Sequence, residues 1–254
     1  MTNKHFIYIF FLLIFLLCKN NKKIISNFKN KINKINKIFD KVFILNLDKD
    51  KKKLDSMKIK LNNYNINFER FSAINGKELK NIKLLRYGNE GAVGNKKSVI
   101  EMIKIAKKNN YKRILLLEDD LIFIKNFNKK FNLSYNELIK NNNNWNLLYF
   151  GASNRKKSND KQKYFRKPHN SYGSFAVGID NSVFDLILKY ENDNRPIDDI
   201  MVEEIQKNKA FKTFVFNPML ITADQRKISS TDGVKWDEKF YYNLNNINMD
   251  DYNF

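Results

Sequence analysis

The stretch Arg113-Ile-Leu-Leu-Leu-Glu118-Asp119-Asp120-Leu121-Ile122-Phe123 places three consecutive acids between two apolar runs. A short run of isoleucine and leucine is typical of a buried strand. Three carboxylates at the end of such a strand repel one another and are costly to desolvate, and a divalent cation offsets that cost. The stretch therefore favours a metal site at the carboxyl edge of a sheet, where open α/β folds bind ligands. An exposed acidic turn between a strand and a helix is the alternative.

The residue composition limits the chemistry of any such site. The chain has 254 residues, enough for one large domain or two small ones. Its only histidines are His5 and His169, so structural zinc and His-based catalytic dyads are nearly excluded. Cys18 is the single cysteine, so no intramolecular disulfide can form. Any metal must be held by carboxylates, which indicates Mn²⁺ or Mg²⁺.

The net charge of +20 would ordinarily suggest a nucleic-acid partner. Here the excess is mainly lysine rather than arginine and is spread along the chain, whereas base and phosphate readers favour arginine. No nucleic-acid partner is expected, although a basic nucleic-acid-binding protein is kept as the least favoured alternative. Attraction of an anionic substrate, such as a nucleotide diphosphate, is compatible with the charge.

The N-terminus carries an apolar run, Phe6–Cys18, followed by a segment rich in lysine and asparagine. The run has 13 residues, fewer than the roughly 20 that span a bilayer comfortably. We expect residues 1–23 to be an uncleaved membrane anchor and residues 24–40 a basic stalk, which makes the protein membrane-associated. A signal-like segment and a buried N-terminal element are the alternatives, and the side of the membrane stays open.

Strand-like and helix-like patterns alternate through residues 41–232, the expected globular domain. This alternation indicates a single α/β domain with a mixed, mostly parallel sheet flanked by helices. Residues 153–170 are expected to form a polar loop, and residues 233–254 a polar C-terminal tail. The expected strands are 42–45, 68–74, 114–117, 145–151, 171–179 and 211–216, and the expected helices are 49–63, 91–108, 181–190 and 196–207.

In this order the segments resemble glycosyltransferase family 25, which includes bacterial lipooligosaccharide galactosyltransferases and collagen galactosyltransferase domains. The matching segments are Val42–Asp48, Phe68–Gly76, Gly91–Gly94 with Ser98, Leu115–Leu121, Trp145–Gly151, Tyr172–Val177 and Pro196–Asp198. The chain departs from the family pattern where Val99 replaces a histidine and where Lys49 and Lys53 replace arginines. These departures motivate one alternative, a catalytically inactive, glycosyltransferase-like binding protein.

The resemblance implies a GT-A-like, Rossmann-like fold and transfer of a hexose, galactose or glucose, from a UDP-sugar. The acceptor would be a hydroxyl of a glycan or a protein, and the reaction would be inverting and dependent on Mn²⁺ or Mg²⁺. Asp120 is the expected direct metal ligand and Asp119 the second. Glu118 is either a ligand or a group that orients the other two.

The resemblance also implies roles for residues outside the acidic motif. An inverting reaction needs a base, for which Asp198 and Asp199 are the candidates; the alternative is that Asp198 only caps the helix that follows. Lys53 and Arg155 are further candidates to neutralise the diphosphate, and Ser229 is expected in the same loop as Gln225. The expected donor-binding residues are Asn46, Asp48, Lys49, Gly91, Gly94, Ser98 and Gln225.

Overall fold

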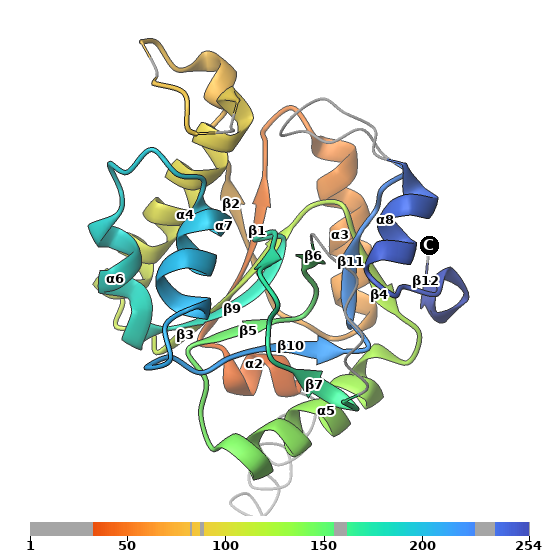
Figure 1. Ribbon diagram of the computed structural model, residues 1–254. Coiled ribbons are helices and arrows are strands. Elements are labelled where there is room, and N and C mark those ends of the chain that lie inside the picture. The colour runs from red at the N-terminus through yellow and green to blue at the C-terminus, as the bar shows by residue number, and fades with distance from the viewer. Residues whose placement is uncertain (1–32, 82, 87–88, 155–161, 227–236, 254) are drawn as a thin grey trace, which may run out of the picture.

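The computed structural model describes residues 33–81, 83–86, 89–154, 162–226 and 237–253. The described strands form a central sheet of seven strands in the order β2-β1-β3-β9-β5-β10-β7 (Figure 1). β9 and β7 run antiparallel to their neighbours, and the other five strands share one direction. The strands are β1 Lys41–Asn46, β2 Glu69–Ser72, β3 Arg113–Glu118, β5 Leu147–Tyr149, β7 Tyr164–Arg166, β9 Ala176–Asp180 and β10 Thr213–Asn217. The expected mixed, mostly parallel sheet is thus confirmed.

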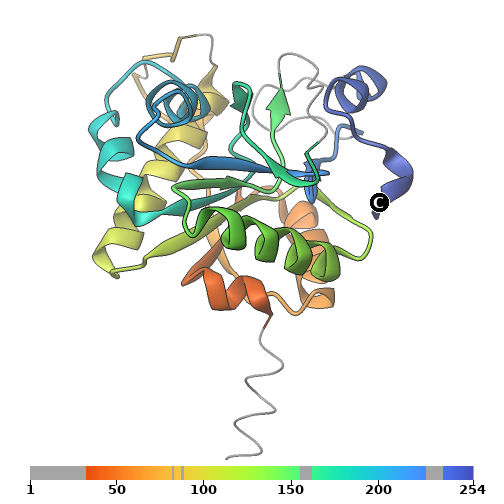
Figure 2. The same cartoon turned by 60° about the horizontal axis from the view of Figure 1, so that its bottom comes forward.

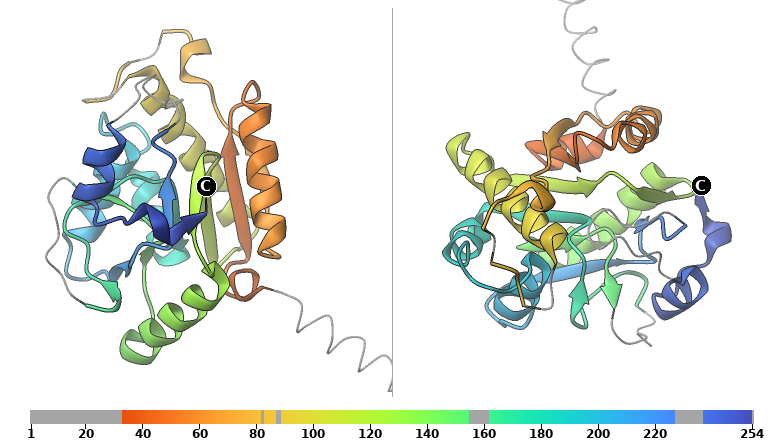
Figure 3. Two further views of the ribbon diagram at one scale, coloured as in Figure 1. Left: turned by 90° about the vertical axis from the view of Figure 1, so that its right-hand side faces the viewer. Right: turned by 90° about the horizontal axis from the view of Figure 1, so that it is seen from above.

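Helices cover both faces of this sheet. The chain moves outward from β1 to β2 through α3 (Lys51–Asn63) and back across to β3 through α4 (Glu90–Lys108). Because such crossovers are right-handed, α3 and α4 lie on opposite faces (Figure 3). Helices α6 (Phe184–Lys189) and α7 (Ile197–Ile200) pack beside α4. A short 3₁₀ turn, η2 (Asn181–Val183), precedes α6, and a π-helical turn, η3 (Met201–Gln206), extends α7.

On the α3 side lie α2 (Lys34–Ile38) and α5 (Phe127–Asn142), which contact each other (Figure 2). Asn33 donates hydrogen bonds to Tyr64 O at the end of α3 and to Asn128 Oδ1 in α5, at 2.6 and 2.9 Å. Ile35 and Phe39 are 0% and 2% exposed and belong to the core. The last residues of the expected stalk therefore pack onto the domain.

Two smaller sheets complete the fold. β4 (Leu121–Ile124) pairs with β11 (Ile221–Ala223) and β12 (Tyr252–Asn253), and β6 (Ser153–Asn154) pairs with β8 (Ser171–Tyr172). The C-terminal residues also include helix α8 (Glu238–Leu244) and the turn η4 (Met249–Asp251). The stretch 233–254, expected to be a polar tail, therefore contributes an edge strand. The asparagine-rich sequence of this stretch gave no apolar signal that would predict a strand.

The expected membrane anchor, residues 1–23, lies outside the described residues. Within the described part of the chain, every helix is too short or too polar to cross a membrane.

A tight contact fixes the segment after β2 against α4. The 3₁₀ turn η1 (Gly76–Glu78) lies so close to α4 that a Cβ on Gly76 would be 1.6 Å from Glu90 O. A Cβ on Gly94 would likewise be 2.3 Å from Ile74 O. Ser98 Oγ donates to Gly94 O at 2.7 Å and accepts from Ile74 N–H at 2.8 Å. These contacts hold the segment 73–77 at the beginning of α4.

We expect Ser98→Ala to lower the free energy of unfolding by about 1–3 kcal/mol, because it leaves the Ile74 N–H without its acceptor. Urea denaturation measures the change. Ser56→Ala, at a half-exposed position in α3, is the matched control and should leave stability unchanged or slightly raised, since alanine favours helix. Equal stability of the two variants would contradict the role given to Ser98.

Candidate active site

The carboxyl end of β1 is tied to the acidic turn by Asn46, which is 2% exposed. Its Nδ2 donates to Asp119 Oδ2 at 2.6 Å and to Asp50 O at 3.0 Å, while its Oδ1 accepts from Arg70 Nε at 2.9 Å. β1 and β3 are parallel neighbours, and Leu45 is in register with Glu118. The ends of the two strands therefore meet where the order of the sheet reverses, which is where such folds bind ligands.

The three acids of the motif have different partners. Glu118 Oε1 accepts from Asn95 Nδ2 at 3.3 Å, and Asp119 is held by Asn46. Lys53 Nζ lies 3.3 Å from Asp120 Oδ2 and 3.9 Å from Asp119 Oδ1. Lys53 thus approaches two of the three acids, whereas Glu118 is bonded to Asn95. In the residues that the structure covers, no group of three or more His, Cys, Asp and Glu side chains is arranged to hold a metal ion.

Burial and mutual repulsion perturb these groups. Desolvation, followed by the charges of Asp120 and Asp119, raises the pKa of Glu118 to about 8. Desolvation raises the pKa of Asp119 to about 6, although the hydrogen bond from Asn46 opposes the shift. Burial by itself would lower the pKa of Lys53, but the carboxylates of Asp120 and Asp119 outweigh it and the pKa is raised. Excess negative charge is thus only partly balanced by the Lys53 ammonium.

These acids line a cavity of about 90 Å³ together with residues from the ends of neighbouring elements. Lys49 and Asp50 come from the segment after β1, and Gly91 and Asn95 come from the first turns of α4. Asn95 Oδ1 is buried and has no hydrogen-bond partner in the described part of the chain. We call this cavity the acidic pocket. It brings together Lys49, Gly91 and the three acids, which are among the expected site residues.

Five of the expected donor-binding residues lie outside the lining of the acidic pocket: Asn46, Asp48, Gly94, Ser98 and Gln225. Gly94 and Ser98 are buried against the segment 73–77 and help to position that segment. Asp48 is exposed and its carboxylate accepts hydrogen bonds from Arg70 and from Ser72 Oγ, the latter at 2.7 Å. The family resemblance identified these positions, whereas their contacts with other residues become visible only in the structure.

Gln225 lies two residues after β11, beside the acidic turn. Asp224 N–H donates to Asp120 O at 2.8 Å, and Gln225 N–H donates to Tyr242 Oη at 3.2 Å. The Asp224 carboxylate is also held by the Arg226 guanidinium at 2.7 and 2.8 Å. Gln225 therefore lies near Asp120, as the expectation of a donor contact requires. The candidates Arg155 and Ser229 lie outside the described residues.

Asp198 and Asp199 lie in the first turn of α7. Asp198 Oδ2 accepts from Gly173 N–H at 3.3 Å, and Glu118 N–H donates to Phe175 O at 2.8 Å. Gly173 and Phe175 are two residues apart, so their Cα atoms are separated by at most about 7 Å. One short segment thus links Asp198 to the acidic turn. Asp198 Oδ1 also accepts from Asp199 N–H at 3.1 Å. The N-cap position of α7 is Pro196, without a side-chain cap hydrogen bond, so the alternative in which Asp198 caps this helix is wrong.

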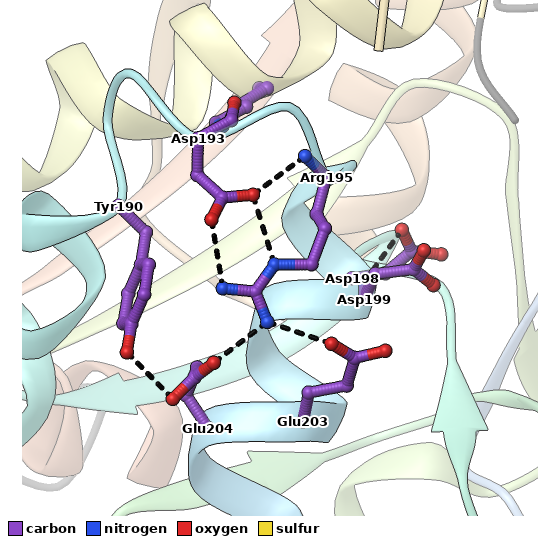
Figure 4. Close-up of polar contacts among 8 residues, drawn as sticks. Tyr190, Asp193, Arg195, Asp198, Asp199, Glu203 and Glu204 are labelled. Carbon is purple, nitrogen blue, oxygen red and sulfur yellow. Dashed lines mark hydrogen bonds and ion pairs between the residues drawn. The ribbon is translucent and has the colours of Figure 1, made fainter. Parts of the chain in front are cut away.

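Arg195 holds the segment that leads into α7 (Figure 4). Its guanidinium makes two bonds of 2.9 Å to Asp193 and bonds of 2.7 Å to Glu203 and Glu204. Tyr190 Oη also donates to Glu204, at 2.7 Å. These contacts fix the start of α7 and with it the position of the two aspartates.

Two residues of the site were not predicted by the sequence. Asn95 follows the glycine pair in an ordinary helical stretch, and only its helical position, one turn after Gly91, indicates that it reaches the same pocket. Tyr241 comes from the expected tail and shares a hydrogen bond of 3.2 Å with Ser153 Oγ. Nothing in the local sequence indicates that this tyrosine approaches the domain.

The raised pKa values predict a pH-dependent stability. A carboxyl group whose pKa is higher in the folded state binds more protons there, so its contribution to stability is lost as pH rises through the folded pKa. In the presence of a chelator, the free energy of unfolding should fall between about pH 5 and pH 8, by on the order of 1–3 kcal/mol. Glu118→Gln should flatten this decline, whereas Glu137→Gln in α5 should not. Parallel profiles for all three proteins, measured by urea denaturation, would contradict the shift.

Comparison with solved structures gives distant similarities. One is the crystal structure of a glycosyltransferase involved in glycosylation of the major capsid of PBCV-1, with 13% identity and a TM-score of 0.40, covering 69% of this chain and 81% of that one. Another is the crystal structure of A197 from STIV, with 14% identity, a TM-score of 0.36 and coverage of 68% and 79%. No function is transferred from similarities this low. No curated protein sequence matches the chain.

The family comparison covers the acidic pocket itself. The family model described as glycosyltransferase family 25 (LPS biosynthesis protein) matches residues 39–173, which is just over half of the chain. The match includes β1, α3, α4 and β3 and ends in the segment that links Asp198 to the acidic turn. The chain belongs to glycosyltransferase family 25.

Proposed function

We propose that this protein transfers a hexose, galactose or glucose, from a UDP-sugar to a hydroxyl group of a glycan or a protein, with inversion at the anomeric carbon. The observation that carries the proposal is the acidic pocket, where the ends of β1 and β3 meet the first turns of α4. Lys49 and the N–H groups at the beginning of α4 are suited to a diphosphate, because helix N-termini attract anions. Gln225 is proposed to contact the donor from the β11 side.

We propose that Mn²⁺ or Mg²⁺ binds with the donor. Hard oxygen donors suit these ions, and Asp119, Asp120 and the unpartnered Asn95 Oδ1 provide them. A magnesium ion in a nucleotide site is commonly held by one or two carboxylates and completed by phosphate oxygens, so a protein cage of three ligands is not required. A bound ion would supply Lewis-acid stabilisation of the leaving diphosphate. Glu118, with its raised pKa, would orient its neighbours or join them as a ligand.

Asp198 is the preferred base for the acceptor hydroxyl, and Asp199 is the second candidate. A base must lie within reach of the acceptor proton while the donor occupies the pocket. The link through Gly173 and Phe175 keeps Asp198 beside the acidic turn, and the Arg195 contacts hold the helix that carries it.

The apolar segment Phe6–Cys18 is proposed to keep the enzyme at a membrane, as its composition predicts.

The alternative of an inactive relative rests on departures from the family pattern. One of them, Val99, is 0% exposed and lies in the hydrophobic core, so this position contributes nothing to the surface of the acidic pocket.

We expect Asp120→Asn to weaken UDP binding in the presence of Mn²⁺ by about tenfold or more, equivalent to about 1.4 kcal/mol, and to abolish hexose transfer. Isothermal titration calorimetry and release of UDP from UDP-galactose and UDP-glucose measure these effects. Asp55→Asn, an exposed aspartate of α3 paired with Lys58, is the control and should behave as the parent protein. Undiminished turnover by Asp120→Asn would refute the metal proposal. Absence of UDP binding by the parent protein would favour the inactive alternative.

We expect Asp198→Asn to lower kcat by about 10²–10⁴-fold while leaving UDP affinity unchanged, because asparagine keeps an acceptor for Gly173 N–H but cannot take up the proton. Asp199→Asn, made in parallel, identifies which aspartate is the base. If Asp198 serves only to hold the start of α7 against Gly173, its variant should retain kcat, and the effect should appear in thermal unfolding instead.

A further inference from the structure

A second cavity, of about 390 Å³, lies next to the acidic pocket. Ile74 lines both cavities, so they are direct neighbours. The walls of this second cavity come from the residues around Leu79 and Leu84, from α4, and from the loop Glu191–Asn194. Val93 and Ile100 add apolar surface from α4. The cavity can therefore pack against the carbon-bound hydrogens of a sugar ring.

Four lysines give this cavity its polar character: Lys80, Lys83, Lys96 and Lys97. Lys96 is 3% exposed, and its Nζ donates to Asp193 O at 2.5 Å. Lys80, Lys83 and Lys97 are exposed, and no ion pair holds them within the described part of the chain. We call this space the lysine cavity.

The carboxylates of the lysine cavity are already bonded to other cations. Lys104 Nζ donates to Glu101 at 2.9 Å and to Glu191 at 2.7 Å, and Lys104 itself does not line the cavity. Asp193 is held by Arg195, which also lies outside the lining (Figure 4). The exposed ammonium groups of Lys80, Lys83 and Lys97 are thus available to a ligand, beside the side-chain amides of Asn81, Asn192 and Asn194, and as cations they favour an anion.

The lysine cavity also adjoins the proposed chemistry on two sides. Ile74 separates it from the acidic pocket, and its wall at Asn194 is followed four residues later by Asp198, the proposed base. In a transfer reaction the acceptor must reach both the donor and the base. A neighbouring cavity with apolar walls and free ammonium groups is suited to that role.

We propose that the lysine cavity binds the acceptor, and that this acceptor is a saccharide carrying a phosphate or a carboxylate group. The inference rests on the proposed function for the acceptor role, but binding of an anionic saccharide does not depend on catalysis. The anionic group would lie among Lys80, Lys83 and Lys97, and the sugar ring would lie against the apolar wall.

The test uses the double variant Lys83→Glu/Lys97→Glu, whose positions are both exposed and outside the acidic pocket. Lys129→Glu/Lys140→Glu, at exposed positions on α5, is the matched control for the change of charge. Saturation-transfer difference NMR measures binding of glucose 6-phosphate, glucuronate, glucose and inorganic phosphate to each protein. Thermal unfolding checks that both variants fold, and calorimetry with UDP and Mn²⁺ measures donor binding independently.

We expect glucose 6-phosphate, glucuronate or both to bind the parent and control proteins more tightly than glucose and inorganic phosphate. Affinity should fall by about tenfold or more in Lys83→Glu/Lys97→Glu, with UDP affinity unchanged. Which of the two anionic sugars binds identifies phosphate or carboxylate as the group recognised. Equal binding by the cavity variant and the control would overturn the proposal, as would binding of inorganic phosphate equal to that of glucose 6-phosphate.

The two proposals can fail separately. UDP binding without binding of either anionic sugar would overturn the acceptor site and leave the proposed transfer standing. Loss of sugar-phosphate binding in the cavity variant, in a parent protein that does not bind UDP, would support the anion site and overturn the transfer function.

Discussion

Repulsion among three consecutive carboxylates at the end of a buried strand is the constraint around which the fold is arranged. Asn46 fixes Asp119 from the neighbouring strand, and Lys53 approaches Asp119 and Asp120 from α3. A single ammonium, that of Lys53, lies among these acids, and burial, followed by the charges of Asp120 and Asp119, raises the pKa of Glu118 to about 8. A nucleotide diphosphate would add further negative charge, so its binding at this edge requires more positive charge. This requirement favours a divalent cation that arrives with the donor.

The chain leaves the central sheet directly after these acids. β4 starts at Leu121 and pairs with β11 and β12, two strands that come about 100 or more residues later in the sequence. The acidic turn is therefore held from both ends, by β3 in one sheet and by β4 in another. The bond from Asp224 N–H to Asp120 O joins the loop after β11 to the same turn. Distant parts of the chain thus fix the geometry of three adjacent residues.

Local signals allowed the elements on the β1 side of the fold to be predicted. The apolar runs of β1 and β3 and the helical spacing in α3 and α4 are contained within single elements, and the structure places them as expected. The strand β12 could not be predicted, since Tyr252–Asn253 is ordered by pairing with β4 and not by its own composition. The antiparallel direction of β9 is likewise set by its partners β3 and β5.

Part of the candidate site, like part of the fold, could be predicted from the sequence. Lys49, Gly91 and the acids come from strand ends and a helix N-terminus, where topology alone brings residues together. The contacts that Gly94 and Ser98 make with Ile74 were not predicted, because backbone contacts between elements cannot be inferred from a motif. Sequence patterns therefore identified the edge of the sheet that carries the candidate site. The role of each residue at that edge depends on contacts between elements, which these patterns do not contain.

One turn of α4 shows how the two cavities are related. Successive residues of a helix point about 100° apart, so Asn95, Lys96 and Lys97 have different neighbours. Asn95 contacts Glu118 in the acidic pocket, whereas Lys96 and Lys97 line the lysine cavity, and Lys96 also contacts the loop before α7. A ligand that binds in one cavity and displaces this turn of α4 would also displace residues that line the other cavity. Donor and acceptor binding would then be energetically coupled through a rigid helix that contacts both sites.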